Sequence, residues 1–371
     1  MESTIHEILN RTARAPDYHL THDHSDALYN IQTCHTITRG GKLIWCQDCK
    51  SGTVFYHPCN QRGCPFCYLK NQIRWMYKML RKLLPISHYH LIFSIPQAFT
   101  ITWLNNKKDI VKILFSAVSQ AIKEYGEDTG LMLGIILVFQ SHGKGMCYKP
   151  HMHCILTAGG LSEKNEWIEI GSLEYKKLED KFREKFNQEM EKWLAPEKLP
   201  DIKKIRDNEW RVHAEFHGET GKGIVNYLSH SIAGVVIDMK QNFQIDEEKG
   251  TIGFTERHDK KSTKTVLEKK TFTERYLNHI PLRRSVVIRS YGFYSNRYKK
   301  ELEELRKRFP KCEEDRKTEI ETKGVKCYIC CSKNIIVIPF SNWENVLLLF
   351  YLYSHGPPGH GEVINIVKKV S

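Results

Sequence analysis

Residues 147–156 read CYKPHMHCIL, and the most specific predictions about this chain start from this stretch. Apart from its histidines, it is typical of a buried strand that begins after a proline. Residues i and i+2 of a strand point to the same face about 7 Å apart. His151 and His153 therefore converge on one face, while Met152 and Cys154 point into a core. Two imidazoles on one face can bind a single divalent cation.

The preceding strand, expected at residues 130–143, offers a third ligand. Gln140 and His142 share one face of it, and either could add an oxygen or a nitrogen to the imidazole pair. Without such a neighbour, packing or chance would explain the two histidines better. A set of three ligands leaves positions open for substrate, which is typical of catalytic metal sites. Imidazoles favour Mn²⁺, although Mg²⁺ is also a candidate.

Strand and helix patterns alternate on both sides of this pair and predict an α+β architecture, with helices layered on a central sheet. The expected strands are 88–96, 130–143, 150–156 and 209–218; the expected helices are 68–85, 107–126, 173–194 and 221–234; a hairpin is expected at about 235–258.

Half of the cysteines lie between residues 34 and 67. Cys46 and Cys49 form one C-x-x-C pair, and Cys64 and Cys67 form another. Two such turns complete a tetrahedral zinc shell, so we expect one zinc ion on these four thiols. A disulfide framework is disfavoured because the N-terminus lacks the apolar core of an export signal.

Cys34 and Cys59 remain in the same block, close to His24, His35 and His57. They form either a second zinc site or two buried thiols, and the spacing does not decide between these.

The C-terminal tail holds Cys327, Cys330 and Cys331. Its single C-x-x-C pair, without a partner nearby, is only a weak indication of a metal. The apolar residues 346–355 are too few to span a bilayer and are more typical of a packed helix.

The charge of the chain favours a polyanionic partner. Its 371 residues carry a formal net charge of +13, and nucleic acid binds such proteins by releasing counterions from phosphates. Three basic residues near the cysteines are candidate DNA contacts. Arg62 lies between Cys59 and Cys64, and Lys70 and Arg74 follow Cys67. No run of eighteen apolar residues occurs, and with no export signal the sequence predicts a cytoplasmic protein without a membrane partner.

Tyr227 lies in a predicted helix after a glycine-rich lead-in, with His217, Lys222 and His230 close by in sequence. Lys222 makes this a suitable place for a phosphate. The GETGKG segment at 218–223 is not a P-loop, because that motif requires glycine at Phe216 and Ser or Thr at position 223. Nucleotide hydrolysis is therefore excluded.

The segment KPHMHCILTAGGL resembles the HUH motif (His–hydrophobic–His) of rolling-circle transposases of the insertion sequence ninety-one family. Other segments extend the resemblance: the cysteine block resembles that family's N-terminal zinc-binding domain, YHLIFSIP its first sheet strand, VNYLSHSIAGVVI its nucleophile helix, and FTERYLNHIPLRRSVVIRSYGFYSN a downstream segment. Together these matches cover most of residues 30–300.

The resemblance implies a domain in which His151 and His153, on a middle strand of an antiparallel sheet, bind a metal and face the nucleophile Tyr227. It supports Gln140 as the third ligand. In members with two tyrosines the second follows one turn later, where this chain has Ser231, so it resembles a single-tyrosine variant. Lys42 and Gly63 stand where relatives often have histidine.

The resemblance thus predicts a bacterial, nucleoid-associated transposase that nicks and rejoins single-stranded DNA at mobile-element ends through a 5′-phosphotyrosine. It would use one or two structural Zn²⁺ ions and a catalytic Mg²⁺ or Mn²⁺. The expected domains are a zinc-binding module with a basic helix (1–84), the nuclease (85–300) and a tail (301–371). Lys222 is a further candidate DNA contact, and the host replication machinery is a candidate partner.

Two other functions fit the same motifs. A plasmid replication initiator or relaxase uses the same catalytic parts, and substrate sequence would distinguish it. A zinc-dependent DNA-binding regulator with a vestigial histidine pair would bind DNA without cutting it, and a scaffold that uses zinc only to fold would not bind it at all.

Overall fold

The computed structural model describes residues 2–13, 20–193, 209–218, 220–232, 237, 243–258, 261–282, 284–309 and 326–340. The chain divides into two compact units, one formed by residues 1–69 with 317–371 and the other by residues 70–316. Among the described residues, no helix combines the length and the apolar character needed to cross a bilayer.

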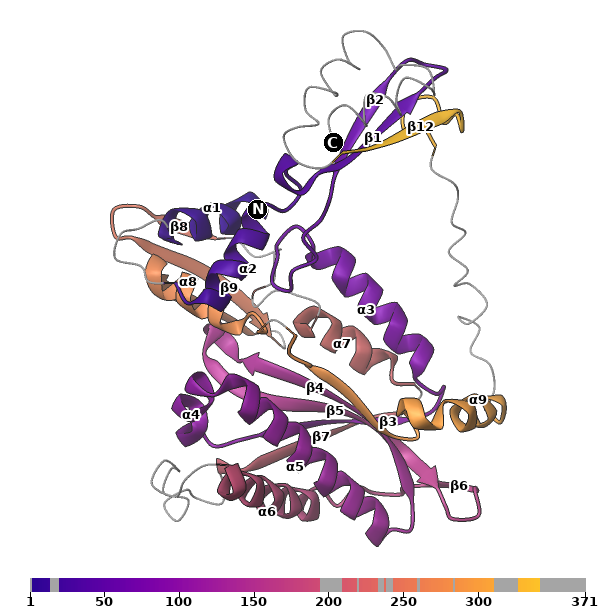
Figure 1. Cartoon of the computed structure of the whole chain (residues 1–371). Coiled ribbons are helices and arrows are strands. Elements are labelled where there is room, and N and C mark those ends of the chain that lie inside the picture. Colours follow the sequence, from indigo (N-terminus) through magenta and orange to yellow (C-terminus); the bar gives the residue numbers. More distant parts are fainter. Residues whose placement is uncertain are drawn as a thin grey trace. The chain divides into compact units, whose positions relative to one another are not determined.

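The larger unit is built on an antiparallel sheet (Figure 1). Its strand order is β11 (Ile288–Gly292), β4 (Met132–His142), β5 (Tyr148–Leu161), β3 (His88–Ser94) and β7 (Arg211–His217), with β6 (Trp167–Glu169) paired to the end of β5. The predicted α+β class, with a central antiparallel sheet and the histidine pair on a middle strand, is confirmed.

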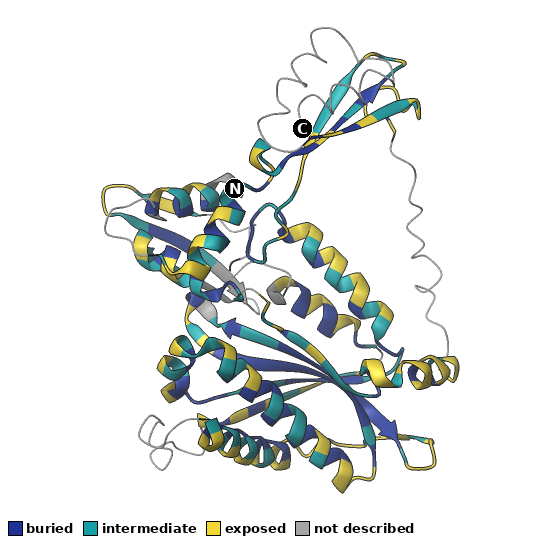
Figure 2. Ribbon diagram, viewed as in Figure 1, coloured by how far each residue is buried: buried dark blue, intermediate teal, exposed yellow. Residues whose placement is uncertain are grey.

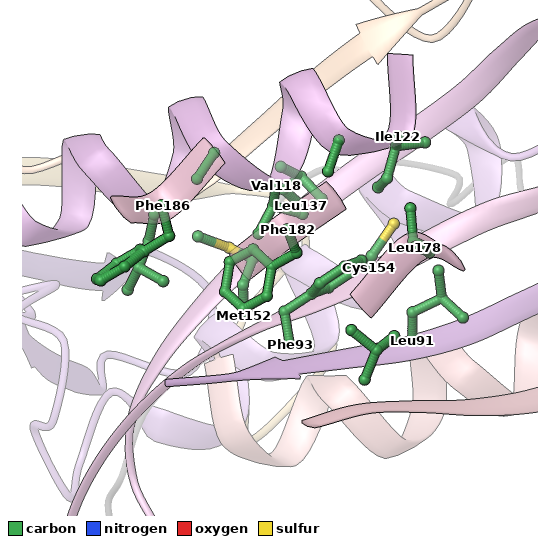
Figure 3. Close-up of a cluster of buried hydrophobic side chains, with 14 of the residues drawn as sticks. Leu91, Phe93, Val118, Ile122, Leu137, Met152, Cys154, Leu178, Phe182 and Phe186 are labelled. Carbon is green, nitrogen blue, oxygen red and sulfur yellow. The ribbon is translucent and has the colours of Figure 1, made fainter. Parts of the chain in front are cut away.

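One face of the sheet is covered by two long helices, α5 (Lys107–Asp128) and α6 (Tyr175–Trp193) (Figure 1). Their apolar residues recur at helical spacing and meet the core-facing side chains of β3, β4 and β5. Figure 3 shows this core, which includes Met152 and Cys154 as the alternation of β5 predicts. The opposite side chains of β5 are thereby turned to the other face.

That other face is covered by α7 (Lys222–Ile232), with α3 (Tyr68–Lys82) packed in the same apolar cluster. The start of α7 approaches β3 so closely that a Cβ on Gly221 would lie 3.2 Å from the Nδ1 atom of His88 and 2.6 Å from a methyl of Leu83. Glycine at this position therefore lets α7 settle directly on the sheet. The strands between the two helical layers are largely buried (Figure 2).

Smaller elements complete this unit: α4 (Thr100–Asn105), β8 (Gln244–Asp246), β9 (Thr251–His258), β10 (Lys261–Glu268), α8 (Lys269–His279) and α9 (Lys299–Lys307). A hairpin was expected at about 235–258, and β8 and β9 form an antiparallel hairpin within that range. Strand β10 adds a third strand to it, which the sequence did not predict. Residues 235, 236 and 238–242 lie outside the described residues. Helix α8 was not predicted.

The smaller unit contains α1 (Glu2–Ala13), α2 (His22–Gln32), β1 (Gly41–Cys46), β2 (Gly52–Tyr56) and β12 (Ile335–Phe340). The strands form an antiparallel sheet in the order β12-β1-β2, with Leu43, Ile338 and Phe340 as its small core. Strand β12, which the sequence predicted to belong to a separate tail, is thus the third strand of this sheet. The apolar residues 346–355 lie outside the described residues.

Candidate metal centres and a facing tyrosine

The register of β4 and β5 brings the predicted ligands together. Gln140 lies directly opposite His151 in the antiparallel ladder, and Val138 lies opposite His153. Because residues i and i+2 share a face, the side chains of Gln140, His151 and His153 all project toward α7. The strand pairing therefore fixes this constellation without any contribution from a loop.

The three ligand atoms are closely spaced. Nε2 of His151 lies 3.0 Å from Nε2 of His153, which lies 2.7 Å from Oε1 of Gln140. Adjacent ligands of an octahedral Mg²⁺ ion at 2.0–2.1 Å are about 2.9 Å apart. The residues therefore fit an octahedral divalent cation and would supply three of its six ligands.

Neighbouring groups hold each ligand in the orientation that an ion needs. Nδ1 of His151 donates to the Lys149 carbonyl at 2.7 Å, which leaves the Nε2 lone pair free. Nδ1 of His153 lies 3.0 Å from Nε2 of His90. Nε2 of Gln140 donates to the His142 ring at 3.2 Å and so turns its oxygen toward His153. Oε1 of Gln140 thus lies among the predicted ligand atoms, and His142 orients it.

Both imidazoles are held in the neutral form. Burial lowers the pKa of His151 to about 4, and burial together with the neighbouring histidines lowers the pKa of His153 well below its usual value. Only a neutral imidazole can bind a cation. At neutral pH the pair is therefore ready to bind a metal without first losing a proton.

Tyr227 projects from α7 over the same face of the sheet. Its ring centroid lies 5.5 Å from that of His90 and 6.2 Å from that of His153, and the residue is 45% exposed. The structure therefore brings the predicted tyrosine and the predicted metal ligands together, on a side open to solvent.

A second group of polar side chains lies beside this tyrosine. Ligand atoms of His90, Glu215 and His217, from β3 and β7, lie within 4.8 Å of one another. Nε2 of His217 is buried without a hydrogen-bond partner and lies 3.7 Å from Oε2 of Glu215. His230, which is also close to Tyr227 in sequence, instead bonds through Nδ1 to Gln72 of α3 at 3.0 Å.

His90 was not predicted as a site residue. The signal for it was present, because HYH at 88–90 repeats the spacing of His151 and His153 on the neighbouring strand. The side chain of His88 shares that face but bonds to Ile86 and Tyr294, away from the ligands.

The basic candidates differ in their surroundings. Lys70 and Arg74 are exposed on α3, and Lys222 is exposed at the start of α7. Arg62 is partly buried, and that burial lowers its pKa. The lysines and Arg74 are therefore better placed than Arg62 to meet a phosphate backbone.

The predicted grouping of the cysteines is wrong. Cys64 and Cys67 do not share a site with the other C-x-x-C pair of the block; they cluster with Cys34 and Cys59. Sγ of Cys67 lies 3.5 Å from that of Cys34 and 3.7 Å from that of Cys59. In the described part of the chain, neither cysteine cluster includes a histidine.

This cluster has the dimensions of a zinc site. Four thiolates at 2.3 Å from Zn²⁺ are about 3.8 Å apart, close to the observed separations. Burial raises the pKa of Cys34, and hydrogen bonds to Cys59 and Cys67 raise that of Cys64, whereas hydrogen bonds from Cys59 and Cys64 lower the pKa of Cys67. A cation would have to displace the protons of Cys34 and Cys64. Cys34, Cys59, Cys64 and Cys67 would therefore hold a structural zinc ion.

The remaining pair, Cys46 and Cys49, meets Cys327 and Cys330. Strand β12 pairs with β1 along six residues and delivers the tail cysteines to the end of β1. The C-x-x-C pair of the tail therefore does have a partner, contrary to the sequence-based expectation.

Burial of His88 predicts a specific loss of stability in acid. Burial lowers its pKa to about 4, so between pH 7 and pH 5 only the unfolded state takes up this proton. The free energy of unfolding should therefore fall by about 2 kcal/mol over that interval on account of this residue. His88→Gln should remove that part of the pH dependence in urea unfolding, whereas His22→Gln, at an exposed position, should not. Equal pH dependence in all three proteins would contradict the prediction.

Two family models match the chain. Residues 4–95 match the model described as "Transposase zinc-binding domain", and residues 134–301 match the model described as "Putative transposase". The first match includes the four clustered cysteines Cys34, Cys59, Cys64 and Cys67, and the second includes His151, His153 and Tyr227.

Two curated relatives are similar over most of their length. The "Putative transposase y4qJ" of Sinorhizobium fredii is 25% identical over 297 residues, which cover 73% of this chain and 74% of the relative. The "Transposase for insertion sequence element IS801" of Pseudomonas savastanoi pv. phaseolicola is 23% identical over 291 residues, 73% of this chain and 70% of the relative. No solved structure shows significant similarity.

Proposed function

Because the chain belongs to the zinc-binding transposases of the insertion sequence ninety-one family, we propose that it cuts and rejoins single-stranded DNA through a covalent 5′-phosphotyrosine. The substrate would be the ends of its own mobile element, processed in rolling-circle transposition. One observation carries the proposal: Tyr227 lies beside His153, whose Nε2 is one of three ligand atoms spaced for a divalent cation.

His151, His153 and Gln140 would hold a Mg²⁺ or Mn²⁺ ion. When bound, that ion would polarise the scissile phosphate and offset the negative charge that builds up on it. The protein itself orients these ligands. Hydrogen bonds to the Lys149 carbonyl and with the rings of His90 and His142 hold their side chains in place.

Tyr227 would supply the nucleophile. Its phenol oxygen forms a bond to phosphorus while the bond from phosphorus to the 3′-oxygen breaks, which leaves a free 3′-hydroxyl and a 5′-phosphotyrosine. The buried Nε2 of His217, in the group beside Tyr227, is a suitable acceptor for the phenol proton. The leaving 3′-oxygen takes up a proton in turn.

Rejoining is the reverse displacement by a 3′-hydroxyl. The phosphodiester energy is conserved in the tyrosine link, so this reaction requires no nucleoside triphosphate. The sequence agrees, because the GETGKG segment departs from a P-loop at Phe216 and Gly223. With Ser231 at the position of a second tyrosine, each active site would form one covalent link at a time.

Contacts to the DNA strand would come from exposed basic residues. Lys222 at the start of α7 and Lys70 and Arg74 on α3 can contact phosphates. The smaller unit, which carries the cysteine clusters, would add further contacts to the DNA. Such contacts hold the substrate through its backbone and make binding depend on salt.

A labelled single-stranded oligonucleotide from the DNA that flanks the gene tests this proposal. With Mn²⁺, we expect a covalent protein–DNA adduct and a shortened strand on a denaturing gel. The same sequence annealed to its complement should react poorly. Salt-dependent binding without any cleavage in Mn²⁺ or Mg²⁺ would favour a DNA-binding regulator instead.

His90 should influence the reaction through His153. Loss of a partner behind a metal ligand costs about 10- to 100-fold in metal affinity or activity, so His90→Ala should weaken Mn²⁺ binding and cleavage within that range. His90→Gln keeps an acceptor for Nδ1 of His153 and should recover most of the Mn²⁺ affinity. Unchanged Mn²⁺ affinity in His90→Ala, measured by calorimetry, would contradict this positioning role.

A further inference from the structure

The second cysteine cluster joins residues from the two ends of the sequence. Sγ of Cys46 lies 3.5 Å from Sγ of Cys330, and Sγ of Cys49 lies 3.5 Å from Sγ of Cys327. All four sulfur atoms lie within 4.8 Å of one another. Cys327 and Cys330 lie beyond the parts of the chain that the two family models match.

These separations are those of a metal site. A disulfide would require about 2.05 Å between two sulfurs, whereas ligands of a tetrahedral Zn²⁺ are about 3.8 Å apart. Four thiols gathered at one point repel one another once ionised, and a zinc ion relieves that repulsion. Two C-x-x-C turns that face each other also supply the two ligand pairs typical of a zinc ribbon.

The backbone around the cluster is arranged to hold both turns. In the tail, the amide of Cys331 donates to the carbonyl of Cys327 at 3.0 Å, and the amide of Cys327 donates to the carbonyl of Ser332 at 2.8 Å. The two turns are tied to each other through Asp48, which accepts hydrogen bonds from Ser332 and Asn334. The amide of Gln47 also donates to the Asn334 carbonyl at 3.0 Å.

We propose that Cys46, Cys49, Cys327 and Cys330 bind a second structural Zn²⁺, which fixes the C-terminal strand β12 to the N-terminal strand β1. The smaller unit then combines residues from both ends of the sequence. Its sheet lacks the third strand, β12, until the C-terminal tail has been synthesised. Among the described residues, the apolar core of that sheet has Leu43, Ile338 and Phe340 as its buried members, which are too few to retain β12 firmly by themselves.

Zinc content of the full-length protein, purified under reducing conditions, tests the proposal. We expect two zinc ions per chain in the native protein and one in Cys327→Ser and in Cys330→Ser. Cys331→Ser is the matched control: this cysteine is adjacent and exposed, lies outside the cluster, and its replacement should leave both ions in place. Cys330→His, which restores a zinc ligand, should also retain two.

Hydrogen exchange supplies a measurement that does not depend on the yield of any variant. Removal of zinc by a chelator should expose the amides of β12 to exchange and leave those of β3 and β5, in the other unit, protected. One zinc ion per chain in the native protein, or two in Cys330→Ser, would overturn the proposal. Protection of β12 that persists in zinc-free protein would overturn the role of the metal in holding that strand.

Discussion

Tyr227→Phe should yield no covalent protein–DNA adduct and should slow strand cleavage by on the order of 10⁴-fold or more, as expected when a reaction loses its nucleophile. Phenylalanine keeps the ring that lies beside His90 and His153, so the packing of α7 should be unchanged. Only the oxygen that would attack phosphorus is removed. The loss should therefore appear in the rate of cleavage and not in DNA affinity, which filter binding can measure separately.

Tyr175→Phe is the matched control for this variant. Tyr175 is also an exposed helical tyrosine, 55% accessible, but it begins α6 on the opposite face of the sheet. The Tyr175→Phe variant should cleave DNA and form the adduct at the native rate. An adduct that survives in Tyr227→Phe would remove Tyr227 from the nucleophile role.

His151→Ala and His153→Ala should each abolish measurable Mn²⁺ binding and reduce cleavage by about 10³-fold, since a cation that polarises a phosphate contributes several kcal/mol to the transition state. Each substitution removes one of three ligand atoms, and the remaining two cannot enclose the ion. Calorimetry with Mn²⁺ alone measures the binding without reference to cleavage.

Two further variants make that test sharper. Tyr227→Phe should bind Mn²⁺ with native affinity, because its phenol is not among the ligand atoms. Gln140→Glu replaces an amide oxygen with a carboxylate oxygen of the same reach and should bind the ion more tightly. Native Mn²⁺ affinity in both alanine variants would show that the ion binds elsewhere.

The histidine site was predictable because its geometry is local. A strand alternates with period two, so His151 and His153 share a face wherever the strand lies. The adjacent strand carries Gln140, and a short connection between antiparallel strands restricts the register that they can adopt. Neither step depends on contacts between distant parts of the chain, and the register of β4 and β5 brings Gln140, His151 and His153 together as expected.

The grouping of the cysteines was not predictable by the same reasoning. A C-x-x-C turn fixes two ligands, but it does not determine which other pair completes the shell. Here Cys49 and Cys64 are close in sequence, yet Cys46 ends β1 and Cys49 lies in the turn that follows. Strand β12, which begins at Ile335, pairs with β1 and brings the tail cysteines to them. That partnership depends on a contact between opposite ends of the sequence, and no local pattern reports it.

His90 illustrates an intermediate case. Its spacing from His88 was visible in the sequence, but its relation to His153 depends on β3 lying next to β5 in one particular register. Only that pairing places its ring beside Nδ1 of His153.

Mass spectrometry of the protease-digested adduct tests the central claim most directly. After reaction with a single-stranded oligonucleotide in Mn²⁺ and nuclease trimming, one peptide should carry a nucleotide joined through its 5′-phosphate to Tyr227. A nucleotide on any other residue, or efficient cleavage with no covalent intermediate, would contradict the account.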